Sequence, residues 1–226
     1  MARPILDRGP TPSYRYGVVF LLTLVLVVFL IAAPDTAWAR GVGILIAGVT
    51  LVIAITTARS GRIPRHSAEA IVLIGTIIFS LGAITDVFSH AIASIAGALL
   101  VGAVPPVIIR GNLRLLRERG VNIQLVSGAL VIYLSIGVVT AFLISFVTQV
   151  SSKPYFAEHA TSTLSDRVYF SFTTLTTTGF GDFSPATSAG RAIAVVEMVL
   201  GQLYLVTVIG LLIGNLVGHR QPRSPG

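Results

Sequence analysis

The chain contains the stretch Thr173-Thr174-Leu175-Thr176-Thr177-Thr178-Gly179-Phe180-Gly181-Asp182, set between two long apolar segments. Glycines 179 and 181 can adopt backbone conformations that a side chain disfavours. Their alternation with other residues lets successive carbonyl oxygens point the same way, toward a narrow axis. Rings of such carbonyls, with a threonine hydroxyl at the inner end, can replace the hydration shell of a cation. The stretch therefore predicts a binding site for a dehydrated cation.

The five residues Thr177-Thr178-Gly179-Phe180-Gly181 resemble the Thr-Val-Gly-Tyr-Gly selectivity filter of the potassium-channel pore family. Residues 165–176 resemble that family's short pore helix, and Asp182 matches the acidic residue that follows the filter. Gly201 falls where many members carry a hinge glycine. The resemblance covers roughly residues 121–218 and does not extend to residues 1–120. It implies that K⁺ is bound at Thr177, Thr178, Gly179 and Phe180 as the transported ion.

Two filter positions depart from the family pattern. Phe180 replaces the usual tyrosine, so the hydrogen bond that its hydroxyl would make to the surrounding residues is absent. Thr178 replaces the usual valine and adds a polar group beside the filter. Both positions contribute backbone carbonyls to the axis, so the departures bear on how the filter is braced.

The composition is that of a membrane protein. Hydrophobic residues make up 54% and charged residues 11% of the chain, and the mean hydropathy is +0.86, which excludes an ordinary soluble domain. Cysteine is absent, which excludes disulfides and thiolate metal sites. The net charge of +7 comes from short loops beside apolar segments. Basic residues in such loops set the topology of a membrane protein and contact anionic lipid, so no nucleic-acid partner is expected.

The apolar pattern predicts an all-α membrane protein with six transmembrane helices and a re-entrant pore helix and selectivity filter between helices 5 and 6. A cytoplasmic segment, 1–16, precedes a four-helix region, 17–109, whose apolar segments are 17–33, 41–58, 70–85 and 91–109. Pro105-Pro106 are expected to bend or end the fourth segment. A basic amphipathic linker, 110–120, leads to the pore domain, 121–218, and a cytoplasmic tail, 219–226, follows.

The pore domain divides further. We expect an outer helix at 121–150, a turret at 151–164, a pore helix at 165–176, the filter at 177–182 and an inner helix at 192–218. Ser165 or Asp166 is expected to cap the pore helix.

The N-terminal region has a second interpretation. A basic start, an apolar stretch and Ala37-Trp38-Ala39 imitate a secretory signal with a cleavage site. The apolar stretch is longer than is usual for a signal, which favours a retained helix.

The distribution of basic residues predicts the orientation. With both termini in the cytoplasm, 12 of the 16 Lys and Arg residues lie inside. The other four, Arg40, Lys153, Arg167 and Arg191, lie outside. We therefore expect a multi-pass protein of the cell (plasma) membrane whose filter mouth faces outward.

The single filter supplies one wall of a pore, so fourfold carbonyl rings predict a homotetramer. Tyr169 and Phe170 are expected to pack around the filter, and Thr173 either bonds behind it or only packs there. Asp182 is expected to concentrate cations at the pore mouth or brace the filter. Gly201 is a candidate gating hinge, although a membrane-helix glycine also permits close packing.

Glu197 is the single acid within an apolar span and is therefore a functional candidate. We expect its carboxyl to hydrogen-bond near the pore helix, in a neutral form, and to bind no ion directly.

Voltage gating is not expected, because residues 91–109 contain no arginine, whereas a voltage sensor repeats arginine every third position. No nucleophile–base set, metal cluster or phosphate loop occurs, so neither an enzyme nor a cofactor is expected. The sequence thus predicts passive potassium conduction. The alternatives are a weakly selective cation channel and a non-conducting regulatory subunit that assembles with another channel; a separate regulatory subunit is likewise a candidate partner.

Overall fold

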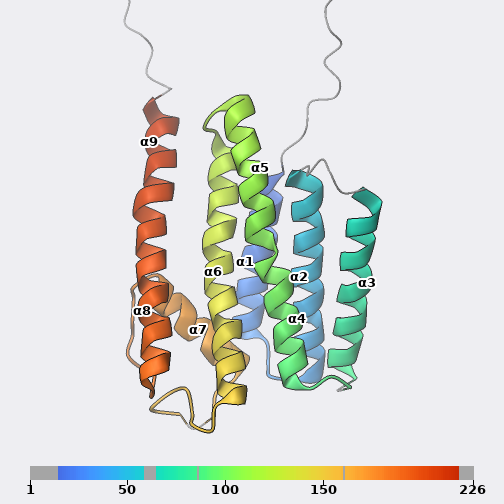
Figure 1. The fold of residues 1–226 in the computed structure, drawn as a ribbon, viewed down its shortest axis with the longest axis vertical. Helices are drawn as coiled ribbons and strands as arrows, with labels where there is room; N and C mark the ends of the chain where they lie inside the picture. Colours follow the sequence, from blue (N-terminus) through green and yellow to red (C-terminus); the bar gives the residue numbers. More distant parts are fainter. Residues whose placement is uncertain (1–14, 59–64, 86, 160, 219–226) are drawn as a thin grey trace, which may run out of the picture.

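The computed structural model describes residues 15–58, 65–85, 87–159 and 161–218, and in these ranges the only regular secondary structure is helical. Long helices lie side by side along the vertical axis of Figure 1, and a short inclined helix, α7, lies against them. The helices are α1 (Tyr16–Ala32), α2 (Ala37–Ala58), α3 (Arg65–Ile84), α4 (His90–Gly102), α5 (Val104–Arg119), α6 (Ile123–Val150), α7 (Leu164–Leu175), α8 (Ser188–Leu203) and α9 (Gly210–Gly218).

Within the described residues, four helical stretches are long and apolar enough to cross a membrane. They are Ala37–Ala58, Ile92–Arg119, Ile123–Val150 and Ser188–Asn215. Two further apolar helices are shorter, at Tyr16–Ala32 and Glu69–Ile84. The predicted all-helical membrane protein is thus confirmed, and four of the six expected spans meet the length criterion.

The helix α6 is the centre of the bundle. It contacts α1, α4, α5, α7 and α8, and α2 packs between α1 and α3. One buried cluster joins α1, α2, α5 and α6 around Tyr16, Leu51, Ile108 and Val131. A second joins α1, α2 and α6 to α7 through Val168. The N-terminal helices therefore form one packed body with the short helix that precedes the filter sequence.

The fourth apolar segment bends at Ala103 and continues. Pro105 and Pro106 lie at the start of α5. N–H groups in the first turn of a helix have no intrahelical acceptor, so the missing proline N–H costs no hydrogen bond. The helix therefore runs on to Arg119, and residues 110–119, expected as a separate linker, are the last turns of α5. There Arg110, Arg114 and Arg117 are exposed, and Arg114 Nε lies 2.7 Å from Glu118 Oε1.

The last membrane helix is not a single regular α-helix. It begins at Ser188, earlier than the expected 192, because the Thr187 hydroxyl accepts from Gly190 N and caps it. Between α8 and α9, residues Tyr204–Ile209 form a π-helical segment. The apolar pattern predicted a regular α-helix here, because it contains no signal for wide turns. Such π-helical turns are often found at functional sites.

Candidate functional site

The N-cap of α7 lies two to three residues earlier than expected. Thr163, and not Ser165 or Asp166, is its N-cap, and Asp166 completes a capping box. The Thr163 hydroxyl accepts from Asp166 N at 3.2 Å, and Asp166 Oδ2 accepts from Thr163 N at 2.8 Å. The Ser165 hydroxyl instead donates to the Ile31 carbonyl of α1, at 2.6 Å. The start of α7 is therefore tied to the end of α1.

The other end of α7 organises the backbone of the filter sequence. Thr178 N and Gly179 N both donate to the Thr173 carbonyl, at 2.8 and 3.1 Å, and Thr177 N donates to the Thr174 carbonyl at 3.0 Å. Three successive amides thus point back at the helix. The Thr173 backbone makes this contact, while its hydroxyl bonds within α7 to the Phe170 carbonyl at 2.9 Å.

The backbone then alternates in handedness. The φ angles are +57° at Thr177, +51° at Gly179 and +85° at Gly181. Thr178 and Phe180 are not among the positive-φ residues, and Thr177 is the one non-glycine with positive φ within the described ranges. Alternating left- and right-handed residues direct successive N–H groups to one side and the carbonyls to the other. A β-branched residue with positive φ is a genuine outlier. The strained backbone at Thr177 therefore marks this segment as a candidate functional site.

The hydroxyl of Thr178 is hydrogen-bonded to the hydroxyl of Thr176. Its Oγ1 is 2.9 Å from Thr176 Oγ1, which in turn donates to the Phe172 carbonyl at 2.7 Å. The residue that departs from the family valine therefore joins a short chain of hydrogen bonds to α7.

Tyr169 contacts both Phe180 and Asp182, at the end of the stretch 177–182. The rings of Phe180 and Tyr169 are stacked, with centroids 6.2 Å apart and an interplanar angle of 6°. The Tyr169 hydroxyl interacts with the Asp182 carboxylate. Tyr169 thus supplies a hydroxyl in the region where Phe180 lacks one, although Phe180 itself remains 69% exposed in a single chain.

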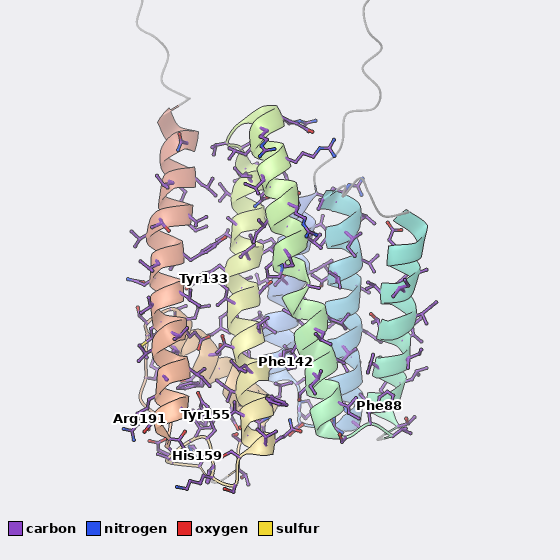
Figure 2. The ribbon with its side chains drawn as sticks, in the orientation of Figure 1. Phe88, Tyr133, Phe142, Tyr155, His159 and Arg191 are labelled. Carbon is purple, nitrogen blue, oxygen red and sulfur yellow. The ribbon has the colours of Figure 1, made fainter. Side chains whose placement is uncertain are left out.

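The turret forms an aromatic cluster at the lower end of Figure 2, where Tyr155 and His159 lie. Phe170 packs edge-on against Phe156, with centroids 5.1 Å apart, and Phe156 packs edge-on against Phe183 at 5.0 Å. The strand-like contact between Phe156 and Pro185 holds the turret to the residues after the filter.

A carboxylate also joins the turret to the chain that follows the filter. Glu158 accepts from Ser184 N at 2.8 Å and from Ser184 Oγ at 2.5 Å. These hydrogen bonds hold the pKa of the Glu158 carboxyl below its ordinary value.

The last membrane helix meets α7 at two points. Gly201 lies against the carbonyl oxygen and side chain of Leu175, and Glu197, which is 2% exposed, is bonded to the Ser171 hydroxyl. Figure 2 shows Tyr133 at mid-height beside the last membrane helix, and its hydroxyl donates to the Leu175 carbonyl at 3.2 Å. Ser171 and Tyr133 were not singled out from the sequence, because neither carries a motif.

The structure therefore brings together most of the candidate residues around the end of α7. Residues 177–182, Thr173 and Tyr169 form one group, and Glu197 and Gly201 contact Ser171 and Leu175 of the same helix. Within the described residues no group of three or more His, Asp or Glu side chains forms a potential metal site.

Residues 128–217 match a protein-family model described as ion channel. This range runs from α6 to α9 and contains the whole group around α7. No curated protein matches the chain. Together with the apolar helices, the match indicates a multi-pass membrane protein, and it supports an ion-channel pore family for residues 128–217.

Proposed function

We propose that the protein is a potassium-selective channel that conducts K⁺ passively through a homotetrameric pore. In this proposal six helices span the membrane, α7 is a re-entrant pore helix, and residues 177–181 line the axis. The protein lies in the plasma membrane with both termini on the cytoplasmic side. The exposed arginines of α5 contact anionic lipid of the inner leaflet.

The alternating backbone at residues 177–181 carries this proposal. φ is positive at Thr177, Gly179 and Gly181, and the amides of Thr177, Thr178 and Gly179 are bonded to the end of α7. In this proposal the alternation turns the carbonyls away from α7. A wall of free carbonyls is what a cation requires when it leaves its hydration shell. The C-terminal end of α7 adds partial negative charge at the start of this wall.

The exposed surface of one chain supports assembly. Residues 176–182 are all exposed, so a single copy provides only one side of a coordination cage. The adjacent α8 and the π-helical segment expose a run of large apolar side chains: Val195, Val196, Val199, Leu200, Leu203 and Val206. In a tetramer, residues 176–182 of four copies would face one another and complete the carbonyl rings. The exposed apolar side chains of α8 and the π-helical segment would pack against neighbouring copies and lipid.

The gating mode follows from the charge distribution. Arg110, Arg114 and Arg117 lie on exposed final turns of α5, and the apolar part of the α4–α5 helix contains no arginine. Charge movement through the membrane field would therefore be small, and steep voltage dependence is not expected.

Thr178 favours a second candidate, a cation channel of weak selectivity. Its hydroxyl is tied to Thr176, and this bond replaces the apolar packing that a valine would provide. If this contact loosens the filter, the variant Thr178→Val should raise the preference for K⁺ over Na⁺.

Cation flux through the purified full chain in liposomes tests the proposal. We expect K⁺ flux that is blocked by barium and is much larger than Na⁺ flux under an equal gradient. Comparable Na⁺ flux would favour the weakly selective channel. No flux of either ion from verified tetramers would overturn autonomous conduction and favour a regulatory subunit.

A further inference from the structure

Glu197 forms a buried junction between three helices. Its Oε1 lies 2.5 Å from the Ser171 hydroxyl of α7, and the same hydroxyl lies 2.6 Å from the Gly137 carbonyl of α6. All three residues are buried, and Ser171 is 0% exposed. One serine oxygen therefore connects the outer helix, the short inclined helix and the last membrane helix.

The count of protons decides the state of the acid. A serine hydroxyl has one proton to donate, and a carbonyl oxygen can only accept. If Ser171 donates to the Gly137 carbonyl, the second short contact needs a proton from Glu197. If Ser171 donated to an ionised Glu197 instead, two oxygens without a shared proton would remain 2.6 Å apart. The geometry is satisfied when Glu197 is a neutral carboxylic acid that donates to Ser171.

The surroundings of Glu197 agree with the neutral form. Within the described residues Glu197 forms no ion pair, whereas Arg40 pairs with Asp35 and Arg114 pairs with Glu118. Its second oxygen, Oε2, is also buried, and besides Ser171 the side chain of Thr140 on α6 hydrogen-bonds to the carboxyl group. An unpaired carboxylate inside an apolar span is strongly disfavoured, so the protonated acid is the stable form.

The junction is in register with a second contact one turn away. On α6 the residues involved are Tyr133 and Gly137, on α7 they are Ser171 and Leu175, and on α8 they are Glu197 and Gly201. Each pair is spaced i, i+4, which places its two members on one helix face. Leu175 immediately precedes Thr176 and the filter. A displacement of α8 at its contacts with Ser171 and Leu175 would therefore also displace the filter backbone.

We propose that Glu197 is a positioning residue: as a neutral carboxylic acid it fastens α8 to α7 through Ser171 and thereby links the position of the last membrane helix to the filter. The conducting role of that filter rests on the proposed function. The protonation of Glu197 and its hydrogen bond to Ser171 do not depend on the proposed function.

Infrared difference spectroscopy tests the bond without any flux measurement. Spectra of the purified full chain at neutral pH, wild type minus Glu197→Gln, should contain the carbonyl band of a protonated carboxylic acid. The variant Ser171→Ala should retain the band and shift it to higher frequency, because the acid loses its acceptor. Carboxylate bands in place of the acid band would overturn the proposal.

Flux measurements test the consequence. Glutamine can donate an N–H to Ser171, so Glu197→Gln should keep K⁺ flux within about twofold of wild type. Methionine has a similar length and no donor, so Glu197→Met should lower flux by about tenfold or more. The double variant Glu197→Met/Ser171→Ala should be no worse than Ser171→Ala alone, because Ser171→Ala already breaks the bond to Glu197 together with the bond to Gly137.

Ser145→Ala is the matched control. Ser145 is likewise a fully buried serine, but its hydroxyl bonds only to the Ala141 carbonyl of its own helix, at 2.9 Å. Its substitution should leave flux near wild type. Equal loss in Ser145→Ala and Ser171→Ala, or equal loss in Glu197→Gln and Glu197→Met, would contradict a specific link.

The two proposals can fail separately. A wild type that conducts no K⁺ would refute the proposed function, while the infrared band would still decide the state of Glu197. A conducting wild type without the acid band would refute this inference alone. If Glu197→Met does not assemble, the infrared comparison and the Glu197→Gln variant still decide the matter.

Discussion

Gly201 of α8 lies directly against the carbonyl oxygen of Leu175, the last residue of α7. A Cβ on Gly201 would meet that oxygen, and it would also lie 2.8 Å from Leu175 Cδ1. Glycine is therefore required here by close approach of two helices. The hinge role that the family resemblance implies stays a prediction, and the two roles have different consequences.

Gly201→Ala is expected to destabilise the assembled protein, because α8 must move away from α7. Overpacking of this kind typically costs about 1–3 kcal/mol. The thermal unfolding of the detergent-solubilised protein should therefore shift to lower temperature. Gly75→Ala is the control, since nothing lies within 4 Å of a Cβ on Gly75. Unchanged stability with altered opening would instead support the hinge.

Alanine at Gly179 or Gly181 is expected to abolish K⁺ flux. Both glycines have positive φ, where an L-residue costs about 1–2 kcal/mol, and relief of that strain would rotate a filter carbonyl. Gly120→Ala is the matched control, because Gly120 has a φ of +66° and open space around it but lies in the turn between α5 and α6. Loss of flux in the control as well would mean that general strain, and not filter geometry, is responsible.

Tyr169→Phe is expected to lower K⁺ flux several-fold while preserving the stack on Phe180. The variant removes the hydroxyl that interacts with Asp182 and leaves the aromatic ring in place. Asp182→Ala should have a similar effect, and the double variant should add little to either. Additive losses in liposome flux would show that the two residues act independently.

The contact between Glu158 and Ser184 predicts a dependence on acid pH. The pKa of Glu158 is lowered from 4.5 by the Ser184 hydrogen bonds, so the folded protein favours the carboxylate. Its contribution to stability is complete above pH 4.5 and is lost as the pH falls through the lowered pKa. We expect wild type to unfold at a higher temperature than Glu158→Gln at neutral pH, with the difference vanishing on acidification. A difference that is constant with pH would refute the carboxylate's role.

Much of this organisation could be read from local sequence. Apolar segments of membrane length predicted the helical bundle, because burying backbone polar groups in lipid requires helices. The glycines of the stretch 173–182 are visible in the sequence. Gly179 and Gly181 have positive φ, which a residue without a Cβ adopts most easily. These signals are short-range properties of neighbouring residues, so they can be predicted before any packing is known.

Contacts between distant segments could not be predicted in this way. Ser171 lies 26 positions from Glu197 and 34 from Gly137, and the Tyr204 hydroxyl reaches the Ala129 carbonyl 75 positions away. Serine and tyrosine occur widely in membrane helices, so only the rotation and depth of each packed helix select these particular partners. The same packing tied Ser165 to α1. Residue type thus specified where the backbone takes positive φ, because glycine lacks a Cβ, and the packing of the helices specified which distant side chains hold that backbone in place.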